Sequence, residues 1–336
     1  MEDRATFTRV EARELMEGVL AETPAEVELA ALLGAMAARG ETAEEIAGFV
    51  DAMRAAATTL PLDAGERDAL VDTCGTGGDA SGTFNISTAA ALVAAAAGAT
   101  VAKHGNRAVT SRCGSADVLE ALGIPVHLTP RRAAEALRRH RFAFLHAPSL
   151  HPAMRAVMPV RRALGVRTVF NLLGPLCNPA GASRQVIGVY GPRQVGVVAE
   201  ALALLGTQHA LVVHGDAGGG GGLDELSTGG ESQVAEVRGG EIVWKRVTPE
   251  SLGLSRAPAG DLAGGNAATN AKILEAVFGG ELSARRDVVL LNAAAVLVVA
   301  ELAPELQDGV RLAAETIDRG EVTRLLAELR APRDAA

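Results

Sequence analysis

Residues 72–88 read DTCGTGGDASGTFNIST, and this stretch decides how the rest of the chain is interpreted. Four glycines and an aspartate stand before a polar run that opens a long alanine-rich segment. Glycine-rich loops that lead into helices bind phosphates, because bare backbone N–H groups and the helix N-terminus can both approach an anion closely. The stretch therefore predicts a phosphate-binding loop at the start of a helix.

Two common nucleotide-binding loops do not fit this stretch. A P-loop requires Lys and then Ser or Thr after its last glycine, whereas Gly82 is followed by Thr83 and Phe84. A dinucleotide-binding loop matches only in a short pattern, and residues 98–100, where an acidic residue is expected, read GAT. Both assignments are disfavoured.

Composition sets limits on the class of protein. The chain has 336 residues and is 48% hydrophobic, which is enough for one large α/β domain and a smaller one. A net charge of −8 without a basic block, and an aromatic content of 3%, disfavour nucleic acid as a partner. The N-terminus resembles no secretion signal, and the longest apolar stretch, from Val288, is too short to span a bilayer. No membrane partner is therefore predicted. The three cysteines are widely spaced, which indicates reduced thiols and predicts a cytoplasmic location.

Residues 8 to about 57 are predicted to form a small all-α unit of three helices. Thr23 and Thr42 each fit a capping box, with a glutamate three residues later, and Gly40 suits a helix C-terminus. Helical spacing places four apolar side chains of the third helix on one face, where they can pack against other helices. These are Ile46, Phe49, Val50 and Met53.

After Pro61, short apolar strands alternate with helices, which predicts a mainly parallel sheet covered on both faces. Strands are expected at 100–102, 142–146, 185–190 and 210–214. Helices are expected at 194–205 and after Ser115, which would cap the second of them. The dipeptide at 239–240 is Gly-Gly, and it predicts a hairpin between strands at 233–238 and 241–247.

A second loop, KHGNRAVTSRCGSADVLEALG at residues 103–123, follows a predicted strand. It offers basic and hydroxyl side chains at the carboxyl end of that strand, where ligands bind in open α/β sheets. Alone, such a loop is more often a solvated turn. Coming after the glycine loop, it is a candidate for binding phosphate oxygens, with Lys103 as the positive charge.

A third segment, GLDELS at residues 222–227, carries two adjacent carboxylates after a run of glycines. In an irregular loop, Asp224 and Glu225 can converge on one cation. Oxygen ligands beside phosphates indicate Mg²⁺. An isolated acidic pair is usually only an exposed loop, and it is the companion phosphate loops that favour a metal site.

A fourth segment, HPAMRAVMPVRRALGVRTVFNLLGPLCNP at residues 151–179, is rich in arginine and interrupted by prolines. Arg161 and Arg162 could be surface residues of a helix. One of them could instead bind a substrate carboxylate in a bidentate manner. The spacing does not choose between these possibilities.

Taken together, GTGGDxxxTFNIST, KHGNRAVTS, PVRRALGVRTVFNLLGPLCNPA and GLDELS resemble the anthranilate phosphoribosyltransferase family, and the resemblance spans nearly the whole chain. It implies a nucleoside-phosphorylase-like α/β fold, with a small α-helical domain at 1–70, a large domain at 71–336, and part of 151–182 packing on the small domain through a hinge. It also implies a homodimer formed through the α domain. The implied reaction is transfer of the phosphoribosyl group of 5-phosphoribosyl 1-diphosphate to anthranilate, with two Mg²⁺ ions per subunit, in tryptophan biosynthesis.

Position by position, the resemblance implies three sets of contacts. The phosphoribosyl diphosphate set is Gly75, Gly78, Asp79, Thr83, Asn85, Ile86, Ser87, Thr88, Lys103, Ser111 and Ser115. The anthranilate set is Gly75, His104, Asn106 and Arg161. The metal set is Ser87, Asp224 and Glu225.

Two alternatives stay open at this point. A pyrimidine nucleoside phosphorylase-like enzyme would share the glycine and KHG loops, but it would need neither the acidic loop nor an arginine for anthranilate. A non-catalytic, nucleic-acid-binding paralogue would show a basic surface and eroded motifs. The acidic chain, with all four segments intact, disfavours both.

Overall fold

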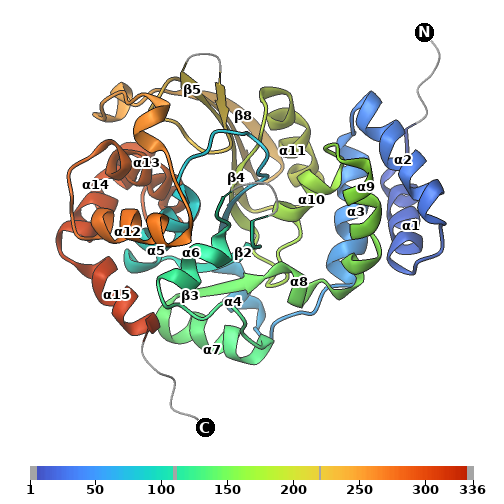
Figure 1. Cartoon of the computed structure of the whole chain (residues 1–336), viewed down its shortest axis with the longest axis horizontal. Helices are drawn as coiled ribbons and strands as arrows, with labels where there is room; N and C mark the ends of the chain where they lie inside the picture. Colours follow the sequence, from blue (N-terminus) through green and yellow to red (C-terminus); the bar gives the residue numbers. More distant parts are fainter. Residues whose placement is uncertain (1–5, 109–111, 219–220, 331–336) are drawn as a thin grey trace.

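The computed structural model describes residues 6–108, 112–218 and 221–330. A lobe of helices, which includes α1, α2, α3 and α9, stands beside a larger α/β body (Figure 1). The first described residues lie in the helical lobe, and the last, at the end of α15, lie on the far side of the α/β body (Figure 1). A small helical unit beside a large α/β unit confirms the predicted fold class.

The helical lobe is built from the predicted helices, α1 (Arg9–Leu20), α2 (Glu26–Arg39) and α3 (Ala43–Ala55). At α3 the capping box is present as predicted, since the Thr42 hydroxyl accepts from Glu45 N and the Glu45 carboxylate accepts from Thr42 N. The cap expected at Thr23 is wrong. Thr23 N donates to Gly18 O and so completes the end of α1, while Glu28 accepts from Ala25 N at the true start of α2.

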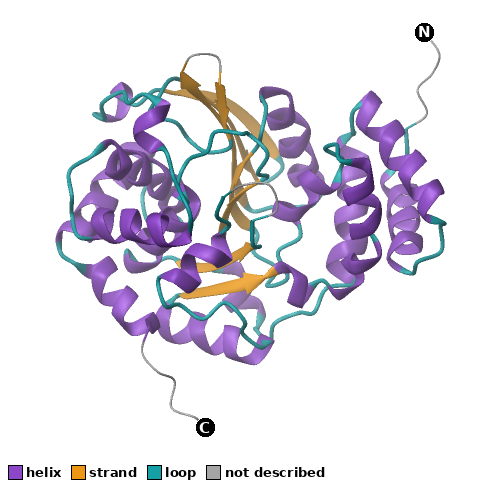
Figure 2. Ribbon diagram, viewed as in Figure 1, coloured by secondary structure: helices purple, strands orange, loops and turns teal. Residues whose placement is uncertain are grey.

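A twisted sheet runs through the α/β body, with the order β3-β2-β1-β4-β5-β7-β8 and β6 beside β5 (Figure 2). The first five strands of this order are parallel to their neighbours, β7 pairs antiparallel with β5, and β8 pairs antiparallel with β7. The strands are β1 (Leu70–Gly75), β2 (Thr100–Gly105), β3 (Phe142–His146), β4 (Arg184–Gly188), β5 (His209–Gly218), β6 (Gly221–Leu223), β7 (Ser232–Arg238) and β8 (Glu241–Val247). The four single strands and the hairpin expected from the sequence are confirmed, whereas β1 was not expected.

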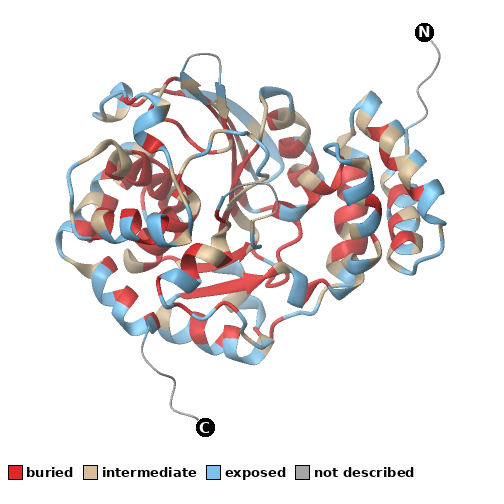
Figure 3. Cartoon of the chain, viewed as in Figure 1, coloured by how far each residue is buried: buried red, intermediate tan, exposed pale blue. Residues whose placement is uncertain are grey.

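Helices cover both faces of the sheet, and the residues where they meet the strands are buried (Figure 3). One face packs against α5 and the helices from α12 onward, and the other packs against α10, α11 and, beyond them, the helical lobe. The remaining helices are α4 (Ala64–Asp68), α5 (Ile86–Ala96), α6 (Ser115–Ala121), α7 (Pro130–His140), α8 (Ala147–Leu150), α9 (Met158–Leu164), α10 (Phe170–Leu176), α11 (Pro192–Leu204), α12 (Ala267–Phe278), α13 (Ala284–Val299), α14 (Leu306–Asp318) and α15 (Glu321–Arg330), with 3₁₀ turns at Pro152–Ala156, Glu250–Leu252 and Ala259–Leu262.

The apolar stretch that begins at Val288 forms most of α13, and nearly all of its residues are buried. This confirms the expectation of a buried helix. Among the described residues, no helix is both long and apolar enough to cross a membrane.

Candidate active site

Two loops that are far apart in sequence meet at the carboxyl ends of the parallel strands. Gly77 N, in the loop after β1, donates to Asp224 Oδ2 at 2.7 Å. Ser87 N, in the first turn of α5, donates to Glu225 Oε1 at 3.0 Å. The glycine loop and the acidic pair, each found separately in the sequence, therefore form one surface at the edge where open α/β sheets bind ligands.

Glycines make this meeting possible. A Cβ atom on Gly75 would lie 2.2 Å from Asp224 Oδ2, and one on Gly188, at the end of β4, would lie 1.6 Å from Asp224 O. Any side chain at either position would displace the acidic loop. Gly188 was missed from the sequence because its neighbour Asp224 lies 36 residues away along the chain.

Three carboxylates gather at this surface. Asp79, from the glycine loop, accepts from Ser81 N at 3.1 Å and from Asp224 N at 3.2 Å. Burial raises the pKa of Asp224 well above its usual value, and the charges of Asp79 and Glu225 raise it further. Burial also raises the pKa of Glu225 to about 7, against the opposing charge of Lys103. Carboxylate oxygens are ligands that a hard divalent cation prefers, and such a cation would offset the buried charges of Asp224 and Glu225. Among the described residues, no group of three or more His, Cys, Asp or Glu side chains is arranged around one metal position.

Lys103 lies beneath this surface rather than on it. Its side chain is 1% exposed, and Nζ donates to Thr73 O at 2.6 Å and to Ser87 Oγ at 3.2 Å. The sequence suggested a positive charge directed at phosphate oxygens. In the structure the ammonium group instead holds the Ser87 hydroxyl in place and offsets the charge of Glu225.

Asn85 connects the glycine loop to two other segments. Its Nδ2 donates to Cys113 O at 3.2 Å, and its Oδ1 accepts from Asn270 Nδ2, on α12, at 2.8 Å. Asn270 is 1% exposed and was not identified from the sequence, since nothing around it forms a motif. Nearby, Ile86 and Thr88 are buried in α5, and Thr83 pairs with Ala263 in an isolated bridge.

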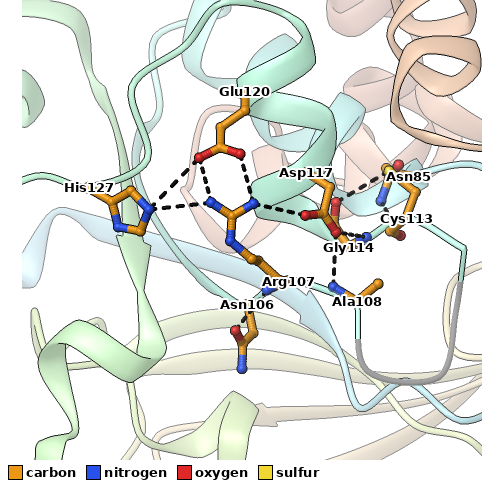
Figure 4. Close-up of polar contacts among 9 residues, drawn as sticks. All are labelled: Asn85, Asn106, Arg107, Ala108, Cys113, Gly114, Asp117, Glu120 and His127. Atoms are coloured by element: carbon orange, nitrogen blue, oxygen red, sulfur yellow. Dashed lines mark hydrogen bonds and ion pairs between the residues drawn. The ribbon is translucent and has the colours of Figure 1, made fainter.

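The second loop is closed by one carboxylate (Figure 4). Asp117 accepts from Ala108 N at 3.0 Å and from Gly114 N at 2.8 Å, and it also pairs with Arg107. The Arg107 guanidinium lies between Asp117 and Glu120, on α6 (Figure 4). Because Gly114 occupies the N-cap position and Asp117 satisfies its N–H, the cap expected at Ser115 is wrong. Ser115 is the first residue of α6, and Ser111 lies outside the described residues.

The residues expected to bind the second substrate each have their own neighbours in the structure. His104 Nδ1 lies 3.2 Å from Gly174 O, and burial lowers the pKa of His104 to about 3, so the ring is neutral near pH 7. The Asn106 Oδ1 atom accepts from Arg107 N at 2.7 Å. Arg161 projects from α9 and stacks on Phe170, at 5.4 Å from the ring centroid. Its side chain forms no ion pair or hydrogen bond within the described part of the chain.

A buried polar cluster holds the segment at 174–178 against the sheet. Gly174 O faces His104, Pro175 O accepts from Gln185 Nε2 at 2.9 Å, and Leu176 O accepts from Arg54 Nε at 2.9 Å. The Asn178 amide donates to Asp72 Oδ2 and to Ala102 O, both at 2.8 Å. These donors and acceptors come from α3, β1, β2 and β4, and so this segment joins the helical lobe to the strands that carry the site.

Comparisons with known proteins show the family of the chain. A family model described as "Glycosyl transferase family, a/b domain" matches residues 67–323, and one described as "Glycosyl transferase family, helical bundle domain" matches residues 2–57. An anthranilate phosphoribosyltransferase from Anaeromyxobacter sp. is 51% identical over 329 residues, which cover 97% of this chain and 95% of that protein.

Solved structures give the same result. The crystal structure of anthranilate phosphoribosyltransferase from Thermus thermophilus has a TM-score of 0.90 at 47% identity, covering 98% of this chain and 97% of that chain. The Saccharomyces cerevisiae enzyme, solved in complex with PRPP and Mg, has a TM-score of 0.85 at 27% identity, covering 96% and 92%. With two family models and close relatives spanning its length, the chain belongs to the anthranilate phosphoribosyltransferase family.

Proposed function

We propose how the residues of this chain divide the work of the reaction that its family catalyses. The phosphoribosyl group of 5-phosphoribosyl 1-diphosphate is transferred to the amine of anthranilate, giving N-(5-phosphoribosyl)anthranilate and diphosphate, in tryptophan biosynthesis. The observation that carries the proposal is the contact between the glycine loop and the acidic pair, through Gly77 with Asp224 and Ser87 with Glu225.

The diphosphate and ribose are assigned to the glycine loop, the start of α5 and the second loop. Gly78 has a positive φ and leaves its backbone open to a ligand. The positive end of the α5 dipole favours an anion nearby, while Ile86 N and Ser87 N already donate to Phe84 O and Glu225 Oε1. In the second loop, the Asp117 carboxylate accepts from Gly114 N, and this bond also holds the neighbouring Ser115 in position. The proposed contacts are Gly75, Gly78, Asp79, Thr83, Asn85, Ile86, Ser87, Thr88, Ser111 and Ser115, with Lys103 supporting them from below.

Ser87, Asp224 and Glu225 are proposed to hold Mg²⁺, with two ions per subunit. Support comes from the crowded carboxylates, whose pKa values are raised by burial, and from the yeast relatives solved with Mg. When bound, Mg²⁺ would neutralise the negative charge that grows on diphosphate as the ribose C1–O bond breaks.

Anthranilate needs positioning more than activation, because an aryl amine is already unprotonated near neutral pH. Arg161 is proposed to bind the carboxylate of anthranilate, with Asn106, Gly75 and the neutral His104 lining the same pocket. The Arg161 guanidinium is available for this role, since it is held only by stacking on Phe170 among the described residues. Holding the amine against C1 replaces an encounter in solution with a reaction within one complex.

The assembly and location of the chain are proposed as well. Val10 and Val27, on α1 and α2, are 65% and 80% exposed, and they suit a homodimer formed through the helical lobe. Part of residues 151–182 is proposed to pack through a hinge on the helical domain at 1–70, with the α/β domain at 71–336. The absence of a disulfide among the three cysteines, all within described segments, is compatible with a cytoplasmic location.

The loss of anthranilate fluorescence tests the proposed roles. Purified protein with 5-phosphoribosyl 1-diphosphate should consume anthranilate only when Mg²⁺ is present. Arg161→Ala should raise the KM for anthranilate by about 10- to 100-fold, because a charged hydrogen bond is lost. Arg162→Ala is the matched control, since Arg162 is exposed on the same helix. An unchanged KM for anthranilate in Arg161→Ala would overturn the carboxylate role, and sedimentation as a monomer would overturn the dimer.

A further inference from the structure

Arg167 lies over the glycine loop and takes no part in the contacts described above. It belongs to the stretch between α9 and α10, and its guanidinium carbon is 4.5 Å from the centroid of the Tyr190 ring. A Cβ atom on Gly78 would lie 3.8 Å from Arg167 Nε and 3.9 Å from its Cδ. The side chain is exposed and forms no ion pair or hydrogen bond with any residue in the described ranges.

Tyr190 connects Arg167 to the glycine loop, because Arg167 stacks on its ring and its backbone is bonded to that loop. It follows β4, and its backbone N donates to Thr76 Oγ1 at 3.1 Å, two residues before Gly78. Thr76 N in turn donates to Gly188 O at 2.9 Å. Stacking on a ring that is tied to the loop limits the positions that the guanidinium can take, so less freedom is lost when it binds an anion.

The charges around the loop call for a second cation on its open side. Lys103 is buried below the loop, with Nζ bonded to Thr73 O and Ser87 Oγ. A diphosphate that approaches Gly78 therefore meets a lysine that is already committed, while Asp79, Asp224 and Glu225 offer it no positive charge. A planar guanidinium with free donors can bind two phosphate oxygens at once.

We propose that Arg167 binds the diphosphate of 5-phosphoribosyl 1-diphosphate above Gly78, and that Tyr190 is the positioning residue that holds Arg167 there. This inference rests on the proposed function of the glycine loop. Two arginines of the 151–179 segment then bind different substrates. Arg161 binds anthranilate, and Arg167 binds the diphosphate.

Steady-state kinetics of Arg167→Gln test the proposal, with Arg162→Gln as the matched control. Arg167→Gln should raise the KM for 5-phosphoribosyl 1-diphosphate and the inhibition constant of added diphosphate by about 10- to 100-fold. The KM for anthranilate should change less than about twofold, and the melting temperature should stay the same because the side chain is exposed. Tyr190→Phe should keep the wild-type KM because the ring remains, and Tyr190→Leu should raise it by about 3- to 10-fold.

The outcomes separate this inference from the function on which it rests. If the wild-type protein shows no transfer at all, the proposed function fails. If the wild type is active but Arg167→Gln keeps its KM for 5-phosphoribosyl 1-diphosphate and its inhibition by diphosphate, the inference is wrong. A rise confined to the KM for anthranilate would also overturn it, because Arg167 would then bind the other substrate. Titration calorimetry of Mg²⁺ and 5-phosphoribosyl 1-diphosphate without anthranilate gives the same comparison independently of catalysis.

Discussion

At the scale of single residues, the site depends on close approaches that only glycine allows. The backbone of Asp224 lies against Gly188, and its carboxylate lies against Gly75. The acidic pair is thereby held where Gly77 N and Ser87 N can donate to its two carboxylates. The position of the proposed metal ligands is thus set by residues that carry no side chain.

Gly188→Ala should disable the site and destabilise the fold. Because the new Cβ would lie 1.6 Å from Asp224 O, the acidic loop has to move. We expect a loss of about 3 kcal/mol in the free energy of unfolding and a fall of at least about 100-fold in kcat/KM. Urea denaturation and the fluorescence assay measure these effects. Gly34→Ala is the control, since a Cβ at this helical position meets nothing within 4 Å and should stabilise the protein by about 0.5–1 kcal/mol. Wild-type kinetics in Gly188→Ala would show that Asp224 does not need this position.

The sequence predicts the chemistry of these residues better than their positions. The glycines, the acidic pair and the second loop are visible as local patterns. The contact of Asp79 with Asp224, and the burial of Lys103 beneath Ser87, depend on which strands become neighbours. Those neighbours are set by the packing of the whole sheet, so residues such as Gly188 and Asn270 leave no local signal.

At the scale of elements, the segment at 174–178 is where helices and strands are joined. Its carbonyl groups and the Asn178 side chain are bound by residues of α3, β1, β2 and β4. Strand β1 was missed for a related reason. Only Leu70 and Val71 are apolar at its start, and Asp72 is buried because it bonds to His104 N and Asn178, 32 and 106 residues away. A strand with polar residues that are buried by distant partners does not show an apolar pattern.

Gln185→Leu tests whether this joint stabilises the protein. It leaves Pro175 O without the donor from β4, at a position where Gln185 is fully buried. The free energy of unfolding should fall by about 1–3 kcal/mol, because a buried carbonyl loses its hydrogen bond. Gln208→Leu removes a comparable but exposed bond, to Asp68, and should have little effect. Equal stability of the two variants in urea would contradict a structural role for the joint.

At the scale of the whole molecule, the helical lobe and one face of the sheet share a continuous apolar cluster. The outer end of the lobe depends on Glu45, which is 0% exposed and accepts from Phe7 N, Thr42 N and Arg39. Burial alone would raise the pKa of Glu45, but the hydrogen bonds from Arg39, Phe7 and Thr42 outweigh it and lower the pKa overall.

Acid should therefore weaken the lobe. Because the folded pKa of Glu45 lies below its ordinary value of 4.5, its contribution is complete above pH 4.5 and is lost as the pH falls through the folded pKa. Glu45→Gln cannot ionise, so it should be about 1–3 kcal/mol less stable than the wild type at pH 7, with the gap narrowing below pH 4.5. Thermal unfolding of both proteins from pH 7 to pH 3 measures this gap. A constant gap would mean that the charge of Glu45 does not contribute.

The central claim is that the glycine loop and the acidic pair form one site for Mg²⁺ and diphosphate. Titration calorimetry with 5-phosphoribosyl 1-diphosphate, with and without Mg²⁺, tests it most directly in the wild type, in Asp224→Asn and in the control Asp216→Asn, an exposed acid of β5. Mg²⁺ should tighten binding at least about tenfold in the wild type and in the control. In Asp224→Asn it should not. Binding that ignores Mg²⁺ in the wild type, or keeps its full Mg²⁺ dependence in Asp224→Asn, would contradict the account.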